Sequence, residues 1–268
     1  GFLFAATRGV KTDGHLYIAK AVELGATVIL CEEALDIQKG VTYVVVENAS
    51  EALGYLASEY YENPSRNIIL IGITGTNGKT SIATMLYQCF MNLGHKTGLL
   101  STIKYSIAGV DTASTHTTPN SVRINELLAE MVDAGCEYAF MEVSSHALHQ
   151  YRTAGLEFKG GVFTNITHDH LDYHTNFKEY IYTKKRLFDS LSSDAFALVN
   201  KDDKNGATMV QNTKATKYTY SLKSVSDFKT KVIESDFDGM LIELGGMEVW
   251  LRLVGHFNAY NVLAVYGV

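Results

Sequence analysis

The sequence predicts an α/β protein in which a mostly parallel sheet is covered by helices and is followed by a small antiparallel sheet. Two observations predict this fold class. From residue 15 to residue 200, short apolar runs alternate with longer helical patterns, and after about residue 215 short strands with glycine turns replace that alternation. Parallel strands need long crossover connections, which are usually helices, so the alternating part favours a parallel sheet.

The expected elements follow from these patterns in chain order. We expect strands at residues 27–31, 41–46, 68–74, 97–102, 138–143, 161–166 and 195–200. We expect helices at residues 15–24, 51–61, 79–93, 122–134 and 177–191. In the last part we expect an antiparallel meander, because glycine turns separate its strands, which we expect at 217–222, 230–235, 239–244 and 248–254. After the meander we expect a helix at 258–268.

The composition limits the class of function. The chain has 268 residues, a hydrophobic content of 46%, a net charge of −6 and three cysteines. No apolar run approaches the roughly 18 residues of a membrane span, and the acidic balance argues against a general nucleic-acid-binding protein. The cysteines, Cys31, Cys89 and Cys136, are odd in number and far apart, which suits neither a disulfide framework nor a zinc knuckle, so we expect a reducing cytoplasm.

The expected domain boundary lies at Pro64, which has polar neighbours on both sides. The only other proline, Pro119, is expected in a loop and marks no boundary. We therefore divide the chain into residues 1–63, a partial N-terminal α/β domain, and residues 64–268, a central domain.

The strongest motif is a glycine loop between an expected strand and an expected helix. Residues 72–80 read Gly-Ile-Thr-Gly-Thr-Asn-Gly-Lys-Thr. Glycines allow a tight turn whose N–H groups point at phosphate oxygens, and the N-terminus of the helix adds partial positive charge. In this interpretation Lys79 reaches the β- and γ-phosphates of a nucleotide, and the Thr80 hydroxyl binds Mg²⁺. The spacing is a variant, because Ile73 stands where a glycine is usual, and the alternative is an ordinary strand–turn–helix.

Two more strands are expected to end in polar residues at the same edge of the sheet. One ends at Glu142, a natural Mg²⁺ ligand beside the glycine loop, although a glutamate at a strand end is by itself more often solvated. The other leads into residues 164–174, which contain three of the nine histidines. Their spacing also suits zinc, but no cysteine is nearby, so a single imidazole beside Mg²⁺ or substrate fits better. A single histidine is more often a structural residue. Six of the chain's nine histidines lie between residues 116 and 174, however, and this clustering favours a functional site.

The helix expected at residues 177–191 carries three consecutive basic residues, Lys184, Lys185 and Arg186. Lys184 lies four residues after Tyr180 and four before Phe188, so it shares their apolar helix row and is expected to point inward. We expect Lys185 and Arg186 to lie on a solvated basic face. A buried lysine near Mg²⁺ is electrostatically unfavourable unless its charge is paired or removed.

Together these motifs resemble the Mur ligase family, and the resemblance covers nearly the whole chain. It rests on the glycine loop at 74–80, Thr-Thr-Pro at 117–119, Met-Glu-Val-Ser-Ser-His at 141–146, Asn-Ile-Thr-His-Asp-His-Leu-Asp-Tyr-His at 165–174, Lys184, and Gly-His-Phe-Asn-Ala-Tyr-Asn at 255–261. Residues 3–15 are similar to the family's nucleotide-sugar-binding N-terminal domain. Several motifs in one order are far more specific than any of them alone.

The resemblance implies an ATP-dependent amide-bond ligase of bacterial peptidoglycan synthesis. The implied reaction adds a third residue, meso-diaminopimelate or L-lysine, to UDP-N-acetylmuramoyl-L-alanyl-D-glutamate through an acyl phosphate. ATP and Mg²⁺ are the implied co-substrate and metal. The enzyme is expected to be a monomer in the bacterial cytoplasm, with no nucleic acid and no membrane among its partners.

The resemblance also implies roles for individual residues. Catalytic roles are expected for Lys79, His170 and Lys184, with Lys184 carbamylated to N6-carboxylysine so that it becomes a metal-compatible anion. ATP is expected to bind Gly75, Thr76, Asn77, Gly78, Lys79, Thr80, Ser81, Asn258 and Asn261. Metal ligands are expected among Thr80, Glu142, His170 and Lys184. The UDP-linked acceptor is expected to bind Thr117, Thr118, Ser144, Gln150 and Arg152, with the loop 9–13 near the uridine.

Three other functions remain open at this point. The chain could be a different ligase of the same superfamily, such as a folylpolyglutamate synthetase. It could be a GTPase or kinase switch, although Asn200-Lys201-Asp202-Asp203 only approaches the guanine-reading motif Asn-Lys-x-Asp. It could also be a nucleotide-binding module without ligase activity.

The resemblance implies a third, C-terminal domain that carries the pocket for the incoming amino acid. We expect these 268 residues to be a truncated piece that lacks this domain, because no counterpart follows Val268. We therefore expect weak binding of ATP and acceptor and negligible turnover by these residues alone.

Overall fold

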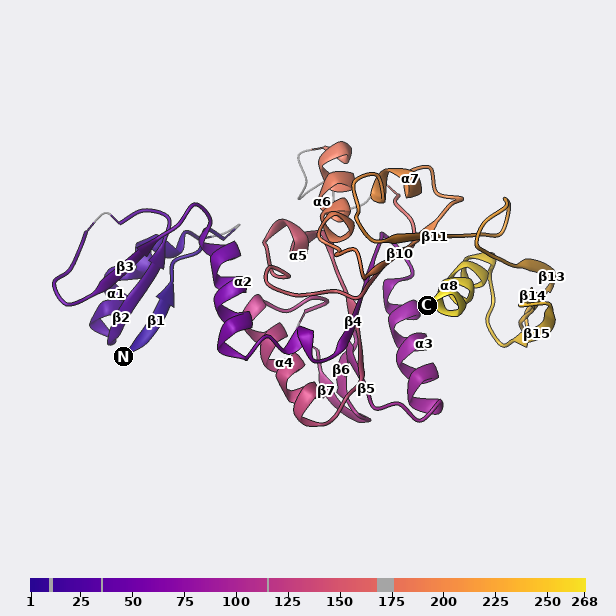
Figure 1. Cartoon of the computed structure of the whole chain (residues 1–268), viewed down its shortest axis with the longest axis horizontal. Coiled ribbons are helices and arrows are strands. Elements are labelled where there is room, and N and C mark those ends of the chain that lie inside the picture. The colour runs from indigo at the N-terminus through magenta and orange to yellow at the C-terminus, as the bar shows by residue number, and fades with distance from the viewer. Residues whose placement is uncertain (10–11, 35, 115, 168–175) are drawn as a thin grey trace.

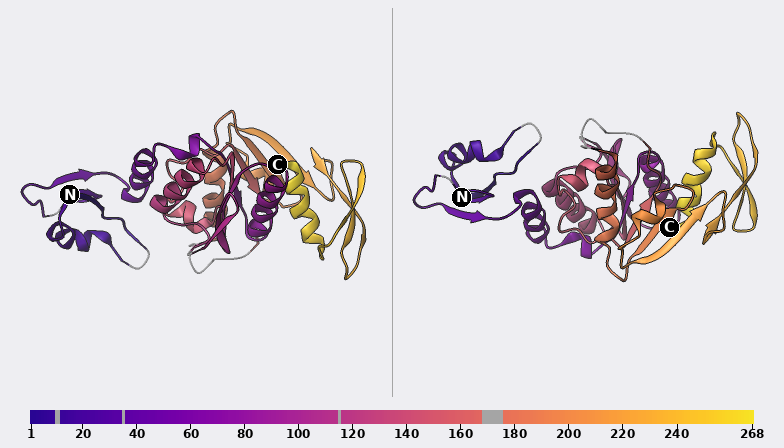
Figure 2. Two further views of the ribbon diagram at one scale, coloured as in Figure 1. Left: turned by 90° about the horizontal axis from the view of Figure 1, so that it is seen from below. Right: turned by 90° about the horizontal axis from the view of Figure 1, so that it is seen from above.

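Three sheets lie in a row along the longest axis of the molecule in a computed structural model that describes residues 1–9, 12–34, 36–114, 116–167 and 176–268 (Figure 1). A three-stranded sheet stands at the N-terminal end, a nine-stranded sheet in the middle and another three-stranded sheet at the far end. The views from below and above show the same order (Figure 2). Within the described ranges no helix has the length and apolar character needed to cross a membrane. The expected fold class is confirmed.

The N-terminal sheet is parallel and has the order β1-β2-β3. Its strands are β1 (Phe2–Ala5), β2 (Ala26–Cys31) and β3 (Thr42–Val45), and the 3₁₀ helix η1 (Gly14–Tyr17) and the helix α1 (Ile18–Glu23) connect the first two. The single helix expected at 15–24 consists of η1 followed by α1, and β1 is a strand that was not predicted. Ala6, Ala21, Ile29 and Cys31 form the small core of this sheet.

The central sheet has the order β12-β11-β10-β9-β4-β8-β5-β6-β7 and is parallel except for its last two pairings. Its strands are β4 (Ile69–Thr74), β5 (Thr97–Leu100), β6 (Lys104–Ile107), β7 (Val110–Ala113), β8 (Tyr138–Glu142), β9 (Gly160–Phe163), β10 (Phe196–Asn200), β11 (Thr216–Ser221) and β12 (Phe228–Lys229). The register pairs Ile73 with Glu142 and Thr74 with Phe163. The carboxyl ends of β4, β8 and β9 therefore lie next to one another.

Helices cover both faces of the central sheet. On one face the core includes Ile82 and Leu86 of α3 (Lys79–Asn92) and Leu263 of α8 (His256–Gly267). On the other face it includes Leu127 of α4 (Ser121–Asp133) and Phe188 of α6 (Phe177–Asp189). The remaining helices of the central part are η2 (Pro64–Arg66), α5 (Ser145–His149) and α7 (Gly206–Met209). The helix expected at 258–268 is confirmed as α8.

Asparagine and serine side chains begin several of these helices. Asn48 caps α2 (Ala49–Tyr60), Asn120 caps α4, Ser144 caps α5 and Asn176 caps α6, and each accepts a hydrogen bond from a backbone N–H in the first turn. These residues satisfy N–H groups that have no acceptor within the helix, which explains why the helices begin there.

The helix α2 joins the N-terminal sheet to the central domain. It packs against α4, and its Ser58 hydroxyl donates to the Gly155 carbonyl, 3.0 Å away. A Cβ on Gly54 would lie 2.7 Å from the Ala154 side chain and carbonyl. A residue larger than glycine at position 54 would therefore separate α2 from the loop after α5.

The far sheet consists of β13 (Lys231–Ser235), β14 (Met240–Leu244) and β15 (Met247–Leu251), which are antiparallel. The antiparallel strands expected at 230–235, 239–244 and 248–254 are confirmed, whereas the expectation that 217–222 belongs to the same meander is wrong, because β11 pairs in parallel with β10. The connection from Asn200 to Thr216 contains α7 and is long enough for a parallel crossover.

The hairpin of β6 and β7 was not predicted. Its turn residues, Ala108 and Gly109, both have positive φ, as the primed hairpin turns require. Alanine is a poor signal for such a turn, since asparagine and aspartate usually occupy that position.

One basic residue of α6 differs from its expected environment. Lys184 is 1% exposed, as expected, and Arg186 is exposed, as expected. Lys185 was expected in solvent but is 2% exposed, and its ammonium group contacts the Asp189 carboxylate at 2.5 Å. The i, i+4 partner on the same helix compensates the burial of its charge.

We expect Leu70→Ala to lower the free energy of unfolding by about 2–5 kcal/mol, because Leu70 is fully buried in β4 at the centre of the sheet. Leu93→Ala provides the control, since that side chain is 69% exposed. Urea denaturation followed by circular dichroism measures both. Equal losses in the two variants would contradict the burial of β4.

Candidate functional site

The glycine loop runs from the carboxyl end of β4 into the N-terminus of α3, so the strand–loop–helix order predicted for it is confirmed. Gly75 has a φ of +148°, and a Cβ there would overlap the Thr164 hydroxyl. Gly78 has a φ of +88°, and a Cβ there would lie 2.6 Å from Asn261 Oδ1. Both positions need glycine, for backbone conformation and for close approach. The loop thus contacts the end of β9 and the helix α8.

Two lysine side chains meet at the loop. Lys79 Nζ donates to the carbonyls of Gly75 and Thr76, at 2.9 and 2.8 Å. Lys184 Nζ, from α6, donates to the same Gly75 carbonyl at 3.0 Å and lies 4.7 Å from the centre of the Tyr180 ring. Two amines that the sequence separates by more than a hundred residues therefore share one acceptor.

Glu142 is fully buried at the end of β8 and faces the loop. The Thr80 hydroxyl donates to Glu142 Oε2 at 2.9 Å, and the Thr102 N–H donates to Oε1 at 2.7 Å. The alternative of a solvated glutamate is wrong, because the register of β4 and β8 places the carboxylate against the first turn of α3. Thr80 and Glu142, two of the expected metal ligands, contact each other, whereas His170 and the zinc alternative at 168–174 lie outside the described residues.

A polar pocket of about 350 Å³ opens beside Glu142. It is lined by residues of the glycine loop, by residues expected to bind the acceptor and by their neighbours: Lys79, Thr80, Thr102, His116, Thr117, Thr118, Glu142, Ser144, His146 and Arg152. Thr118 organises it, because its hydroxyl donates to the Glu142 carbonyl at 2.8 Å and accepts from the Ser144 N–H at 3.1 Å. The Thr117 hydroxyl lies 3.0 Å from that of Thr102. The structure thus gathers four of the five residues expected to bind the acceptor.

Arg152 connects this pocket with a second one. Its Nη1 donates to the Thr118 carbonyl at 2.6 Å, and its Nη2 donates to Gln150 Oε1 at 2.7 Å. The second cavity, of about 610 Å³, is lined by Arg8 and Gly9 from the N-terminal domain and by Gln150, Arg152 and Arg186 from the central domain, among others. Gln150, the fifth expected acceptor residue, therefore lies here, together with Gly9 of the expected uridine loop.

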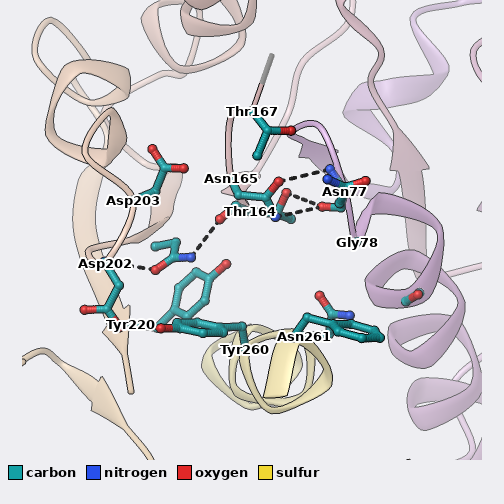
Figure 3. Close-up of a pocket in the computed structure, with 13 residues that line it drawn as sticks. Asn77, Gly78, Thr164, Asn165, Thr167, Asp202, Asp203, Tyr220, Tyr260 and Asn261 are labelled. Carbon is teal, nitrogen blue, oxygen red and sulfur yellow. Dashed lines mark hydrogen bonds between the residues drawn. The ribbon is translucent and has the colours of Figure 1, made fainter. Parts of the chain in front are cut away.

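A third cavity, of about 670 Å³, opens at the glycine loop (Figure 3). Asn77, Gly78, Ser81 and Asn261 line it, as expected of ATP-binding residues. Asn258 is not among its lining residues, although its Oδ1 accepts from Asn261 Nδ2 at 3.1 Å. The loop therefore contributes Asn77 and Gly78 to a nucleotide-sized cavity and Lys79 and Thr80 to the polar pocket at Glu142.

The far wall of the third cavity was not predicted; it consists of Asn200, Asp202, Asp203, Tyr220, Phe257 and Tyr260. In the sequence, residues 200–203 indicate only an incomplete guanine-reading motif. The signal available was their place directly after an expected parallel strand, where ligands bind in open α/β sheets. Thr102, which ends the strand expected at 97–102, was also missed; it donates to Glu142 through its N–H at 2.7 Å and through its hydroxyl at 3.2 Å.

Asp202 connects the residues around this wall through hydrogen bonds. It accepts hydrogen bonds from the Ser221 hydroxyl at 2.7 Å, the Leu222 N–H at 2.9 Å and the Tyr260 hydroxyl at 2.9 Å. Burial acts to raise the pKa of Asp202, but these hydrogen bonds outweigh it and hold the pKa below its ordinary value of 3.8. Burial and the Asp202 carboxylate raise the pKa of Tyr260 to about 12, so its hydroxyl stays a donor.

We expect Asp202→Asn to destabilise the protein in a pH-dependent way. Because the pKa of Asp202 is lowered in the folded state, the ionised carboxylate stabilises the fold at pH values above the unfolded-state pKa near 3.8. This stabilisation is lost as the pH falls through the folded-state pKa. The difference in unfolding free energy between wild type and variant should thus be constant above about pH 5 and shrink below pH 4. Urea denaturation from pH 3 to 7, with the exposed Asp238→Asn as control, measures it, and a pH-independent difference would contradict this account.

Comparison with known proteins places the whole chain in one family. Residues 73–268 match the Mur ligase middle domain, and residues 1–61 match the Mur ligase family catalytic domain. Curated relatives named UDP-N-acetylmuramoyl-L-alanyl-D-glutamate--2,6-diaminopimelate ligase include that of Cytophaga hutchinsonii, 53% identical over 99% of this chain and 55% of the relative, and that of Bacteroides fragilis, 51% identical over 100% and 55%.

Solved structures agree on the fold. A ligase with the same name superimposes with a TM-score of 0.84 at 24% identity, over 98% of this chain and 55% of the other. A folylpolyglutamate synthase from Mycobacterium tuberculosis, complexed with ADP and AMPPCP, superimposes with a TM-score of 0.64 at 19% identity, over 80% and 57%. The chain spans about half the length of the curated relatives it matches. On the strength of both family matches and the identity to these relatives, the chain belongs to the Mur ligase family.

Proposed function

We propose that this chain is the ATP- and acceptor-binding part of a ligase that joins 2,6-diaminopimelate to UDP-N-acetylmuramoyl-L-alanyl-D-glutamate. The observation that carries the proposal is the glycine loop, which lines a cavity of nucleotide size with Asn77 and Gly78 and, with Lys79 and Thr80, lines the pocket that holds Glu142, hydroxyls and Arg152. The names of the relatives at 51–53% identity support the choice of diaminopimelate over lysine.

The nucleotide is proposed to lie with its base in the third cavity and its phosphates over the glycine loop. The N–H groups at the start of α3 have no acceptor within the helix, and the helix dipole favours anions there. Lys79 Nζ, now on the carbonyls of Gly75 and Thr76, needs only to turn toward the γ-phosphate to stabilise the charge that develops during transfer. In this arrangement Lys79 holds the γ-phosphate on the side of the loop that faces Glu142.

The donor set at Glu142 fits a magnesium ion. The Thr80 hydroxyl and the Glu142 carboxylate are hard oxygen ligands, and their oxygens are 2.9 Å apart. Mg²⁺ supplies neutralisation of phosphate charge when bound. Thr102 keeps the carboxylate oriented through its N–H, so Glu142 does not need to reorient to accept a cation. We propose His170 as a further ligand, as the family resemblance implies.

The acceptor is proposed to extend from the second cavity into the polar pocket, because Arg152 lines both. A guanidinium is suited to hold a carboxylate or phosphate of the acceptor. The acceptor's carboxylate oxygen forms a bond to the γ-phosphorus while the bond to ADP breaks. The amine of the incoming residue then bonds to the acyl carbon, phosphate leaves, and the amine loses a proton.

Lys184 is proposed to be carbamylated. Its amine is buried and shares the Gly75 carbonyl with the Lys79 ammonium, so a second positive charge there is disfavoured. The neutral amine is the form that adds carbon dioxide, which forms an N–C bond and releases a proton. The product is an anion that suits a metal site.

The remaining proposals concern the whole protein. We propose the domain division at residues 63 and 64, a monomer and a bacterial cytoplasmic location, where UDP-linked acceptors and ATP occur together. A guanine-nucleotide switch is less supported, because the Asp202 side chain is engaged by Ser221, Leu222 and Tyr260. A folylpolyglutamate synthetase shares the fold, and it differs from the proposed ligase in its substrate.

The function is tested by calorimetric titration of the chain with ATP, GTP, the UDP-linked dipeptide and folate, each with Mg²⁺. We expect binding of ATP and the dipeptide, and a drop in ATP affinity of about tenfold or more in Lys79→Ala, because a charge-assisted contact to phosphate is lost. Lys214→Ala is the matched control, since Lys214 is exposed. Ligation is then assayed with the full-length protein that contains this chain; turnover of folate without turnover of the dipeptide would refute the proposal.

The carbamate is tested by carbon-13 NMR of the chain in labelled bicarbonate. We expect a carbamate signal that is absent in Lys184→Arg, because a guanidinium does not add carbon dioxide at neutral pH. Lys185→Arg is the control, and its signal should match that of the wild type. The absence of the signal in wild type across pH 7 to 9 would rule out the modification.

A further inference from the structure

We propose that Asn165 is a positioning residue for the nucleotide: its side-chain amide fixes the glycine loop in its phosphate-binding conformation before the nucleotide arrives. The inference rests on the proposed binding of ATP and names a residue from the segment that follows a different strand, β9, as part of that site. It concerns the part of the cluster at 164–174 to which the proposed chemistry gives no role.

The amide of Asn165 pairs with both backbone polar groups of Asn77. Asn165 Oδ1 accepts from the Asn77 N–H at 3.1 Å, and Asn165 Nδ2 donates to the Asn77 carbonyl at 3.2 Å (Figure 3). The two bonds require an acceptor and a donor on one planar group, which only an amide side chain of this length supplies. Aspartate at this position would keep the acceptor and lose the donor.

Neighbouring residues of the same strand end extend this contact. The Thr164 hydroxyl also donates to the Asn77 carbonyl, at 2.6 Å. The Asn165 carbonyl accepts from the Thr76 N–H at 2.8 Å, and the Thr167 N–H donates to the Thr76 hydroxyl at 3.0 Å. Thr76 and Asn77 are thus both held by hydrogen bonds to the residues that follow β9.

This attachment decides which N–H groups remain for phosphate. The Thr76 and Asn77 N–H groups already have acceptors in the protein. The phosphates are therefore expected at the N-terminus of α3, where the backbone N–H groups and the helix dipole favour anions. Because the loop is ordered in advance, nucleotide binding does not bear the entropy loss of ordering it.

The test compares Asn165→Ala and Asn165→Asp with the wild-type chain and with Asn212→Ala, a control at an exposed asparagine. Calorimetry measures the Kd for ATP with Mg²⁺, and nitrogen-15 NMR measures hydrogen exchange at the Asn77 amide without nucleotide. We expect a rise in Kd of roughly 10- to 100-fold, faster exchange at Asn77 and an unchanged melting temperature in both variants. Asn212→Ala should leave all three unchanged.

A second pair of variants guards against misfolding. Thr164→Val removes the hydroxyl that donates to Asn77 at nearly constant volume, and Thr164→Ser restores it. We expect faster exchange at Asn77 in the first and rescue in the second. An Asn77 amide that exchanges freely in the wild-type chain, or a Kd unchanged in folded Asn165 variants, would overturn the inference. Failure of the wild type to bind ATP would refute the proposed function instead, and the exchange measurement would still decide the role of Asn165.

Discussion

The parallel pairing of β9, β4 and β8 is the constraint on which the site depends. The register puts Thr74, Glu142 and Phe163 at one edge of the sheet, so the three segments that follow these strands meet there. Parallel strands all end at the same edge, and open α/β sheets bind ligands beyond it. The glycine loop, the buried carboxylate and the strand end that holds Asn77 are therefore consequences of one topology rather than separate features.

Local charge, rather than net charge, suits this edge to anionic ligands. The chain carries a net charge of −6, yet Lys79 lies at the glycine loop and Arg152 lines two cavities. Electrostatic contributions at short range and partial burial outweigh distant surface charges, which water and salt screen. The acidic balance excluded a general nucleic-acid-binding protein and left room for a site of this kind.

The sequence was most informative where a pattern has a fixed physical meaning. The glycine loop, the inward lysine of α6 and the helix α8 were predicted because glycine spacing and helical periodicity specify them directly. The burial of Lys185 was not predictable, since it depends on the neighbours that cover α6. The parallel pairing of β11 and the contacts of Asp202 also depend on partners distant in sequence, which local propensity does not encode.

The central claim is that a nucleotide, a metal and an acceptor meet at the edge formed by β4, β8 and β9. A crystal structure of the chain with an ATP analogue, Mg²⁺ and the UDP-linked dipeptide tests it most directly. We expect a metal within about 2.0–2.1 Å of both Thr80 Oγ1 and a Glu142 oxygen, with the phosphates on the N-terminus of α3. A nucleotide bound elsewhere, or a metal that does not touch Glu142, would contradict it.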